Sequence, residues 1–135
     1  VKDSRGTDRD GWKLTVKQDG DFKNGDSVLK GAQLKFSGLH YAEGDTMPTA
    51  TTDDIILGTD AAVIAQADAT HGSGVSSLAL GTLKEETETN KDADGNDVET
   101  KVQKTAGVNL SVPKGTAIDA GTYSTSVTYE LTAGV

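Results

Sequence analysis

Apolar and polar residues alternate with a period of two along four short stretches of the chain. Successive side chains of a β-strand point to opposite faces, so this period predicts half-buried strands whose apolar side chains point inward. The four predicted strands are residues 12–17, 32–36, 108–112 and 123–132. Their inward-facing residues are Trp12, Leu14 and Val16; Ala32, Leu34 and Phe36; Val108, Leu110 and Val112; and Tyr123, Thr125, Val127, Tyr129 and Leu131.

The rest of the pattern supports an all-β fold. Residues 54–58 and 62–67 are short apolar runs in which the period does not separate a strand from a helical turn, but their Ile and Val content favours strands. Residues 40–54 have no period and contain Pro48, which predicts a loop. No long stretch has the 3.6-residue period of a helix. We therefore predict a single domain of short strands, either a β-sandwich or a barrel-like fold.

Residues 84–104 form two extended arms, mostly polar on both faces, with Asp94-Gly95 between them. Residues 85–99 hold seven acids and one lysine, which is six of the eight net negative charges of the chain. This pattern predicts an acidic hairpin that projects from the body of the domain. Clustered carboxylates suggest Ca²⁺, but Gly95 is at the fourth position from Asp92, whereas a calcium loop needs it at the sixth. A hairpin tip is therefore favoured.

Composition excludes several function classes. The 135 residues include no cysteine, which removes disulfides, thiolate metal sites and cysteine nucleophiles. The nearly neutral body has no basic stripe for nucleic acid, and no apolar run is long enough to enter a membrane. His40 and His71 lie in predicted loops without converging carboxylates. We expect no metal, no cofactor and no enzymatic activity.

Two strands near the ends of the chain carry a family resemblance. "DSRGTDRDGWKLTV" resembles the first motif of the WxL domain, and "AGTYSTSVTYELTAGV" has the frame of the second. Between the two motifs, "GAQLKF", "HGSG" and "VNLSVP" resemble further family segments in the expected order. The resemblance covers essentially residues 1–135, with one departure: Tyr129 stands where the second motif has tryptophan. Family members usually have a further upstream strand, so we expect this sequence to lack one.

The resemblance implies a secreted, non-enzymatic module at the surface of Gram-positive bacteria. It implies noncovalent binding to peptidoglycan or an associated wall polymer. The alternative is a protein–protein subunit of a surface complex, which docks on a WxL-interacting surface protein. The echo between "WKLT" and "YELT" suggests that the two motif strands are neighbours in one sheet.

Each motif residue has a structural reading and a binding reading. Trp12 is either a core residue or a ring that stacks on a ligand, and the same choice applies to Leu14, Tyr129 and Leu131. Arg5 either braces the turn before Gly11 or binds a stem-peptide carboxylate. We expect structural roles for Asp3, Gly6, Gly11 and Tyr123. Lys13 and Lys17 form an outward-facing pair that either contacts wall polymer or is solvated.

Overall fold

The computed structural model describes residues 1–134, which fold as short β-strands with a single turn of 3₁₀ helix, η1 (Gly6–Asp8). The strands of the two largest sheets are β2 (Trp12–Gln18), β5 (Gln33–Phe36), β7 (Thr49–Ala50), β8 (Ile55–Ile56), β9 (Ala62–Ala67), β14 (Val108–Ser111) and β15 (Val127–Ala133). The other strands are β1 (Lys2–Asp3), β3 (Phe22–Asn24), β4 (Ser27–Leu29), β6 (Leu39–His40), β10 (Gly74–Val75), β11 (Ala79–Leu80), β12 (Lys84–Lys91) and β13 (Asp97–Lys104).

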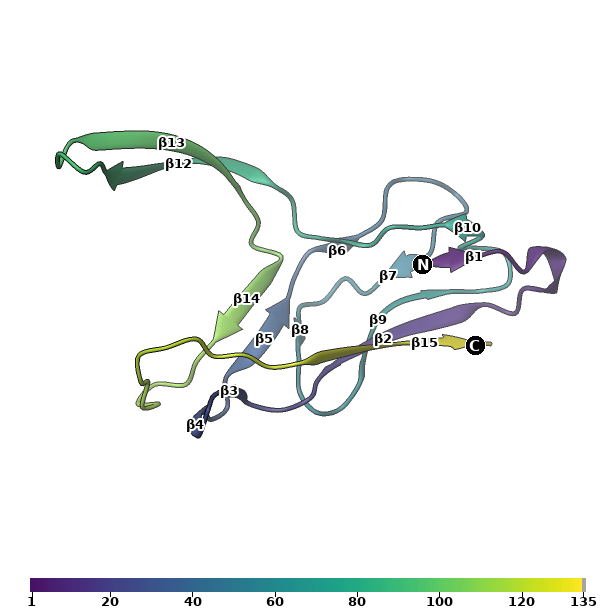
Figure 1. The fold of residues 1–135 in the computed structure, drawn as a ribbon. Helices are drawn as coiled ribbons and strands as arrows, with labels where there is room; N and C mark the ends of the chain where they lie inside the picture. The colour runs from purple at the N-terminus through teal and green to yellow at the C-terminus, as the bar shows by residue number, and fades with distance from the viewer. Residues whose placement is uncertain (135) are drawn as a thin grey trace.

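Two antiparallel sheets make the body of the domain (Figure 1). The first has the strand order β15-β2-β9-β7, and the second has the order β14-β5-β8. The sheets do not close into a barrel, so the sandwich alternative is confirmed. The predicted strands in residues 54–58 and 62–67 are present as β8 and β9, and the predicted loop of residues 40–54 includes strand residues only at His40, the end of β6, and in the two residues of β7.

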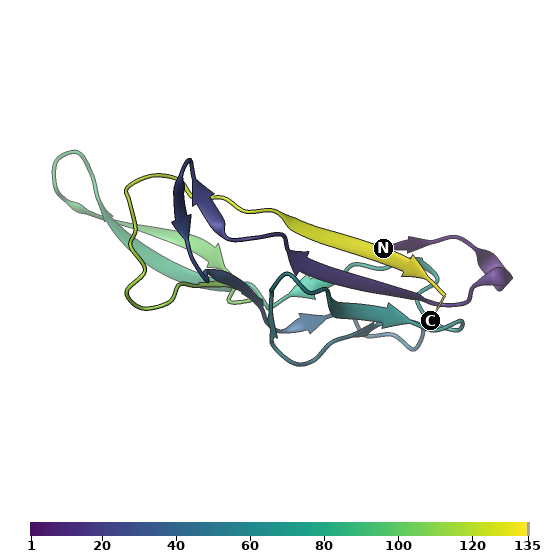
Figure 2. The same cartoon turned by 90° about the horizontal axis from the view of Figure 1, so that it is seen from below.

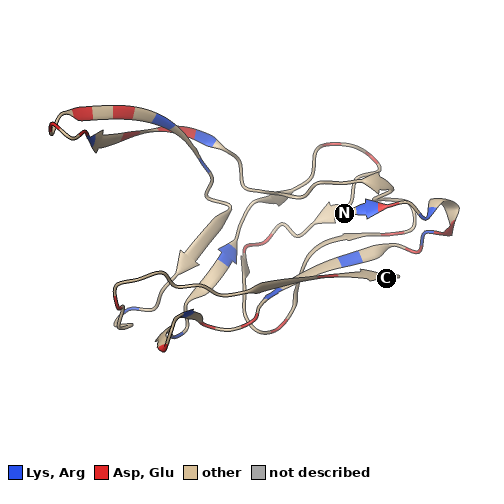
Figure 3. Cartoon of the chain, viewed as in Figure 1, with Lys and Arg blue, Asp and Glu red and all other residues tan. Residues whose placement is uncertain are grey.

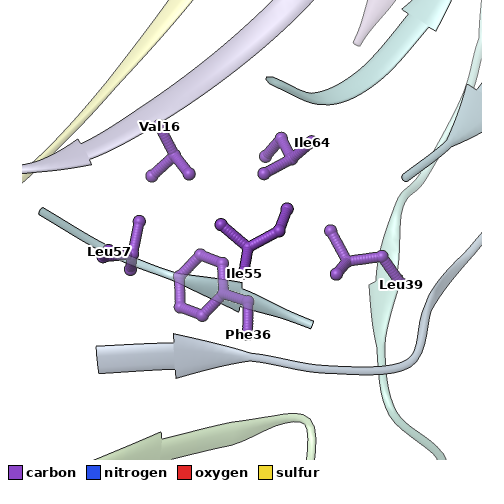
Figure 4. Close-up of a cluster of buried hydrophobic side chains, with 6 residues drawn as sticks. All are labelled: Val16, Phe36, Leu39, Ile55, Leu57 and Ile64. Carbon is purple, nitrogen blue, oxygen red and sulfur yellow. The ribbon is translucent and has the colours of Figure 1, made fainter. Parts of the chain in front are cut away.

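The core lies between the two sheets. Val16 of β2 and Ile64 of β9 face Phe36 of β5 and Ile55 of β8, and Leu57 and Leu39 close the cluster (Figure 4). The predicted inward positions Trp12, Val16, Ala32 and Phe36 are buried. Burial of such apolar surface contributes about 25 cal/mol for each Å² removed from water, so this cluster is the main stabilising contact between the sheets.

A β-bulge explains why the apolar run in β9 shows no simple alternation. The register of β2 against β9 shifts after Leu14, which pairs with Ala65, because the next residue, Thr15, pairs with Val63. Ile64 is the extra residue, and both Ile64 and Ala65 are buried. A bulge inserts one residue and changes the side-chain phase along the strand.

The edge strands β14 and β15 lie on the same flank of the sandwich. Gln18 donates its backbone N–H to the carbonyl of Gly58, just after β8, at 2.8 Å, and Asp19 donates to the carbonyl of Ser126, just before β15, at 2.9 Å. Successive residues of a strand direct their N–H groups to opposite sides, so β8 and β15 lie on opposite sides of β2. β14 is on the side of β5 away from β8, which is the flank of β15.

On this flank, four residues that the alternation predicted to be buried are exposed. Val108 and Leu110 of β14 are 46% and 51% exposed, and Tyr129 and Leu131 of β15 are 55% and 52% exposed. Their side chains are on the core-facing side, since their cross-strand partners include the buried residues Phe36 and Val16. An edge strand has a neighbour on one side only, so the inner face of this flank is open to solvent. Val112 is half-buried.

The expected acidic hairpin is β12–β13, which stands away from the sandwich (Figures 1 and 2). Charged residues of both signs lie along it (Figure 3). Lys101 contacts Glu85 at 2.8 Å, and Lys104 contacts Glu88 at 2.6 Å. At the tip, the Asp92 carboxylate accepts backbone N–H groups of the turn, which lowers the pKa of Asp92. The acidic tip is therefore a self-contained turn.

Candidate functional site

The two motif strands lie side by side, which confirms the expectation that they are neighbours. β2 and β15 pair antiparallel along seven residues without interruption. Leu131 lies opposite Leu14, and Ala133 lies opposite Trp12. Directly opposite residues share a face, so the strands present a common inner face toward the core and a common outer face toward solvent.

The charged cluster before β2 braces the turn into that strand. Arg5 donates from Nε to Oδ1 of Asp3 at 3.1 Å and from Nη2 to Oδ2 at 2.9 Å, which is a two-point ion pair. Nη2 also donates to the carbonyl of Gly11 at 2.7 Å, and Nη1 pairs with Asp10. The hydrogen bonds from Arg5 hold the pKa of Asp3 below its ordinary value, and Asp3 raises the pKa of Arg5.

Two glycines allow this turn. Gly6 has φ +65° and Gly11 has φ +83°, in the left-handed region that favours glycine. Gly11 directly precedes Trp12, so it lets the chain turn from the charged cluster into β2. These contacts fit the structural reading of Asp3, Arg5, Gly6 and Gly11, and they leave few donors of Arg5 free for a ligand.

Trp12 is a core residue in this arrangement. Its side chain is 2% exposed and packs against Ala65 and Ala67, with Leu14 half-buried beside it. Gly72, at φ +72°, lies so close that a Cβ there would be 2.9 Å from the indole Nε1. A buried ring of this size removes about 150–250 Å² from water, so Trp12 positions β2 rather than presenting a surface for stacking.

The outer face of the strand pair is polar and carries both predicted lysines. Lys13 lies opposite Thr132, and Lys17 lies opposite Thr128. Lys17 Nζ is 4.0 Å from the carboxylate of Asp19, and the Thr128 hydroxyl donates to that carboxylate at 2.9 Å. The outer face is therefore a polar row to which both motif strands contribute ammonium and hydroxyl groups, with the Glu130 carboxylate opposite Thr15.

The inner face opens at the β15 edge. Leu131 and Ala133 line a cavity of about 200 Å³ together with Trp12 and residues 1–5. Tyr129 lies two residues back along the same face, and its ring is mostly exposed. Of the aromatic residues in the two motifs, Tyr129 is therefore the one that solvent reaches most. Tyr123, which precedes β15, is half-buried, and its hydroxyl accepts the backbone N–H of Asp119 at 3.0 Å.

Gln18, at the other end of β2, is a structural residue that was not among the predicted ones. Gln18 is buried, donates to the carbonyls of Gly20 and Ala32 at 2.9 and 2.8 Å, and accepts the N–H of Leu34 at 3.0 Å. It thereby ties the end of β2 to the start of β5, beside an open cavity of about 600 Å³. The sequence does indicate this position, because the period of two that places Trp12 and Val16 on the inner face of the strand also places Gln18 there.

No group of three His, Cys, Asp or Glu residues is placed to hold a metal ion within residues 1–134. His71 Nδ1 lies 2.7 Å from Asp68, and the hydrogen bonds from Thr70 and His71 lower the pKa of Asp68. This contact closes a local turn around Asp68.

Within the residues that the structure describes, no helix is long and apolar enough to cross a membrane.

Comparison with known proteins gives one match. A family model described as "WxL domain surface cell wall-binding" matches residues 1–134. No curated protein matches the chain, and no solved structure does.

Proposed function

Because the chain belongs to the WxL domain family of surface cell-wall-binding domains, we propose that it is a secreted module that binds peptidoglycan noncovalently. The observation that carries this proposal is the outer face of the β2–β15 pair, where both motif strands place polar groups side by side. Lysine ammonium groups are donors for stem-peptide carboxylates, and threonine hydroxyls exchange hydrogen bonds with glycan hydroxyl and amide groups. The proposed role is binding, without a catalytic step.

The buried position of Trp12 directs the proposal to this face. A sugar ring cannot stack on an indole that is 2% exposed, so a joint platform of Trp12 and Tyr129 is not available. Lys13 and Lys17 are half-buried by their stems yet turned outward. With only two cations involved, binding depends mainly on shape and hydrogen bonds.

Sedimentation with purified peptidoglycan tests this function. We expect the intact domain to sediment with the polymer, and to do so nearly equally at low and moderate salt, where the screening length falls from about 30 to 10 Å. We expect the double variant Lys13→Ser, Lys17→Ser to remain mostly in the supernatant. The matched control is Lys23→Ser, Lys30→Ser, which removes the same charge from exposed positions near the β3–β4 turn.

The outcomes separate the function from its location. Folded wild-type domain that stays wholly in the supernatant contradicts peptidoglycan binding. Equal sedimentation of wild type and the Lys13, Lys17 variant keeps the function but removes it from the outer face. The emission maximum of Trp12 reports whether each variant is folded, because the indole is buried in the native domain.

A second candidate function is docking on a partner surface protein. One observation favours it: β15 is an edge strand that carries exposed apolar side chains on its inner face. Exposed apolar residues along a free sheet edge are typical of sites where another chain adds a strand. This candidate uses the inner face and the edge, so it is compatible with wall binding on the outer face.

A further inference from the structure

β15 is the least protected sheet edge of the sandwich. Of the four edge strands, β7 and β8 have two residues each, β14 has four, and β15 has seven. Proteins commonly protect an edge by keeping it short, or with lysine, proline or a bulge. Residues 127–133 contain neither lysine nor proline, and their register against β2 has no bulge.

The backbone groups that point out of this edge can be identified by parity. Ser126 accepts a hydrogen bond from Asp19 at 2.9 Å, and Gly134 donates one to Gly11 at 3.1 Å. N–H and C=O groups of alternate residues point to opposite sides of an antiparallel strand. The even-numbered residues of β15 therefore bond to β2, and the odd-numbered residues direct their N–H and C=O groups to the open side. No strand among residues 1–134 pairs with that side.

The same odd-numbered residues carry the inward-facing apolar side chains. Tyr129 and Leu131 are exposed, and Leu131 and Ala133 line the cavity shared with residues 1–5. An extended segment that bonded to this edge would place alternate side chains over Tyr129 and Leu131 and toward the cavity. One added strand would thus satisfy free backbone groups and cover apolar surface together.

The charge at the centre of the edge indicates which segment fits. Glu130 is exposed on the outer face and makes no ion pair among residues 1–134. A cross-strand neighbour opposite Glu130 is favoured when it is basic and disfavoured when it is acidic. A second copy centred on this strand would set Glu130 against its own equivalent, and two chains of net charge −8 repel each other.

We propose that the β15 edge binds an extended segment of a partner surface protein as an added antiparallel strand. The segment has apolar residues opposite Tyr129 and Leu131, and a lysine or arginine between them opposite Glu130. This inference rests on the second candidate function and specifies how the docking occurs. It does not depend on peptidoglycan binding by the outer face.

Amide hydrogen exchange on the full chain tests the proposal directly. In the free domain we expect slow exchange at Thr128 and Glu130, whose N–H groups bond to β2, and fast exchange at Tyr129 and Leu131. The probe is a capped peptide of about ten residues, the span of β15 with its flanks, in which valine and leucine alternate with lysine and threonine. Its binding is expected to protect the Tyr129 and Leu131 amides, with little change at their even-numbered neighbours.

Backbone-modified peptides provide a matched control. N-methylation of the peptide residues opposite Tyr129 and Leu131 removes donors that face β15, and we expect it to weaken binding about tenfold or more. The same modification on the intervening residues, whose N–H groups face away, is expected to have a much smaller effect. Equal loss from both modifications contradicts a strand-like complex.

Protein variants test the side-chain part of the proposal. Tyr129→Lys with Leu131→Lys places charges at the inner edge and is expected to weaken peptide binding about tenfold or more. The matched control, Ile56→Lys, changes an exposed apolar residue on β8, at the opposite flank. Glu130→Lys is expected to reverse the preference, so that it binds a peptide with glutamate in place of lysine more tightly than the basic peptide.

Each result decides the proposal. Protection of the odd-numbered amides together with the charge reversal supports it. Absence of binding at about 1 mM peptide, or binding without protection of Tyr129 and Leu131, overturns it. Protection that appears with protein concentration alone assigns the edge to a second copy instead. If a surface protein copurifies with the domain but leaves those amides unprotected, docking stands and strand addition fails.

Discussion

Two long antiparallel ladders in this molecule differ in what stabilises them. The β12–β13 hairpin has eight residue pairs in continuous register, and the β2–β15 ladder has seven. The hairpin joins neighbouring segments, is exposed on both faces and has cross-strand ion pairs. The β2–β15 ladder joins the two ends of the described chain and packs one face on the core. One ladder is local and charged, whereas the other depends on the fold around it.

The comparison shows that sheet edges are protected unevenly. The hairpin edges carry lysine, glutamate and aspartate at close intervals, which discourages association with other chains. The β15 edge carries one charged residue, Glu130, among apolar and threonine side chains. Charge repulsion therefore opposes an added strand least at the body of the domain, which holds only a small part of the net charge.

The largest expected effect concerns the core side of the β2–β15 ladder. Trp12→Ala is expected to lower the free energy of unfolding by about 3–5 kcal/mol, because it removes a buried ring and leaves a cavity. Urea unfolding followed by far-ultraviolet circular dichroism measures this loss. Tyr129→Ala, on the exposed edge of the same ladder, should cost about 1 kcal/mol or less. Equal losses would contradict the assignment of Trp12 to the core and Tyr129 to the surface.

A smaller effect is expected at the turn that leads into β2. Asp3→Asn removes the carboxylate that pairs with Arg5, so the variant should unfold at lower urea concentration at pH 7. The pKa of Asp3 is lowered from 3.8 by the hydrogen bonds from Arg5. A carboxyl group whose folded pKa is depressed stabilises the fold above 3.8, and this contribution is lost as pH falls through the folded value.

The pH dependence gives the control for this prediction. The stability difference between wild type and Asp3→Asn should shrink as pH falls below about 4. The control Asp53→Asn changes an exposed residue without an ion pair among residues 1–134, and it should unfold at the wild-type urea concentration at pH 7. A difference that stays constant down to pH 2 would show that the Asp3 charge is not what the turn uses.

The smallest effect on the whole domain is expected in the hairpin. Lys101→Ser with Lys104→Ser removes ion pairs to Glu85, Glu86 and Glu88. Exposed ion pairs contribute little to stability, so the urea midpoint should not change measurably. Amide exchange within β12 and β13 should accelerate, as it should for wild type at high salt. A large change in the midpoint would mean that the hairpin and the sandwich unfold as one unit.

Much of the fold could be predicted because it is local. The period of two in residues 12–17 and 32–36 sets which residues of β2 and β5 face the core, and Trp12, Val16 and Phe36 are buried accordingly. The Asp94-Gly95 pair and the polar arms predict the hairpin with its boundaries. One prediction concerned distant segments: the similarity of "WKLT" and "YELT" suggested that the two motif strands are neighbours, and the pairing of β2 with β15 confirms it.

The bulge and the role of Gln18 were not predictable in the same way. Ile64 and Ala65 are both buried only because the register of β9 shifts against β2. Gln18 is buried as a polar residue because three backbone groups satisfy its amide, and two of them, at Ala32 and Leu34, belong to the other layer. Both features arise from contacts between segments far apart in the chain.

The sequence by itself determined the all-β class, the alternation of faces and the projecting hairpin, since these depend on the chemistry of adjacent residues. Only the tertiary structure decided that Val108, Leu110, Tyr129 and Leu131 face inward without being covered. Alternation specifies the face to which a side chain points, but burial also requires a neighbouring strand on each side and a layer above. Strand order supplies those neighbours, and it places β14 and β15 at one edge of the sandwich.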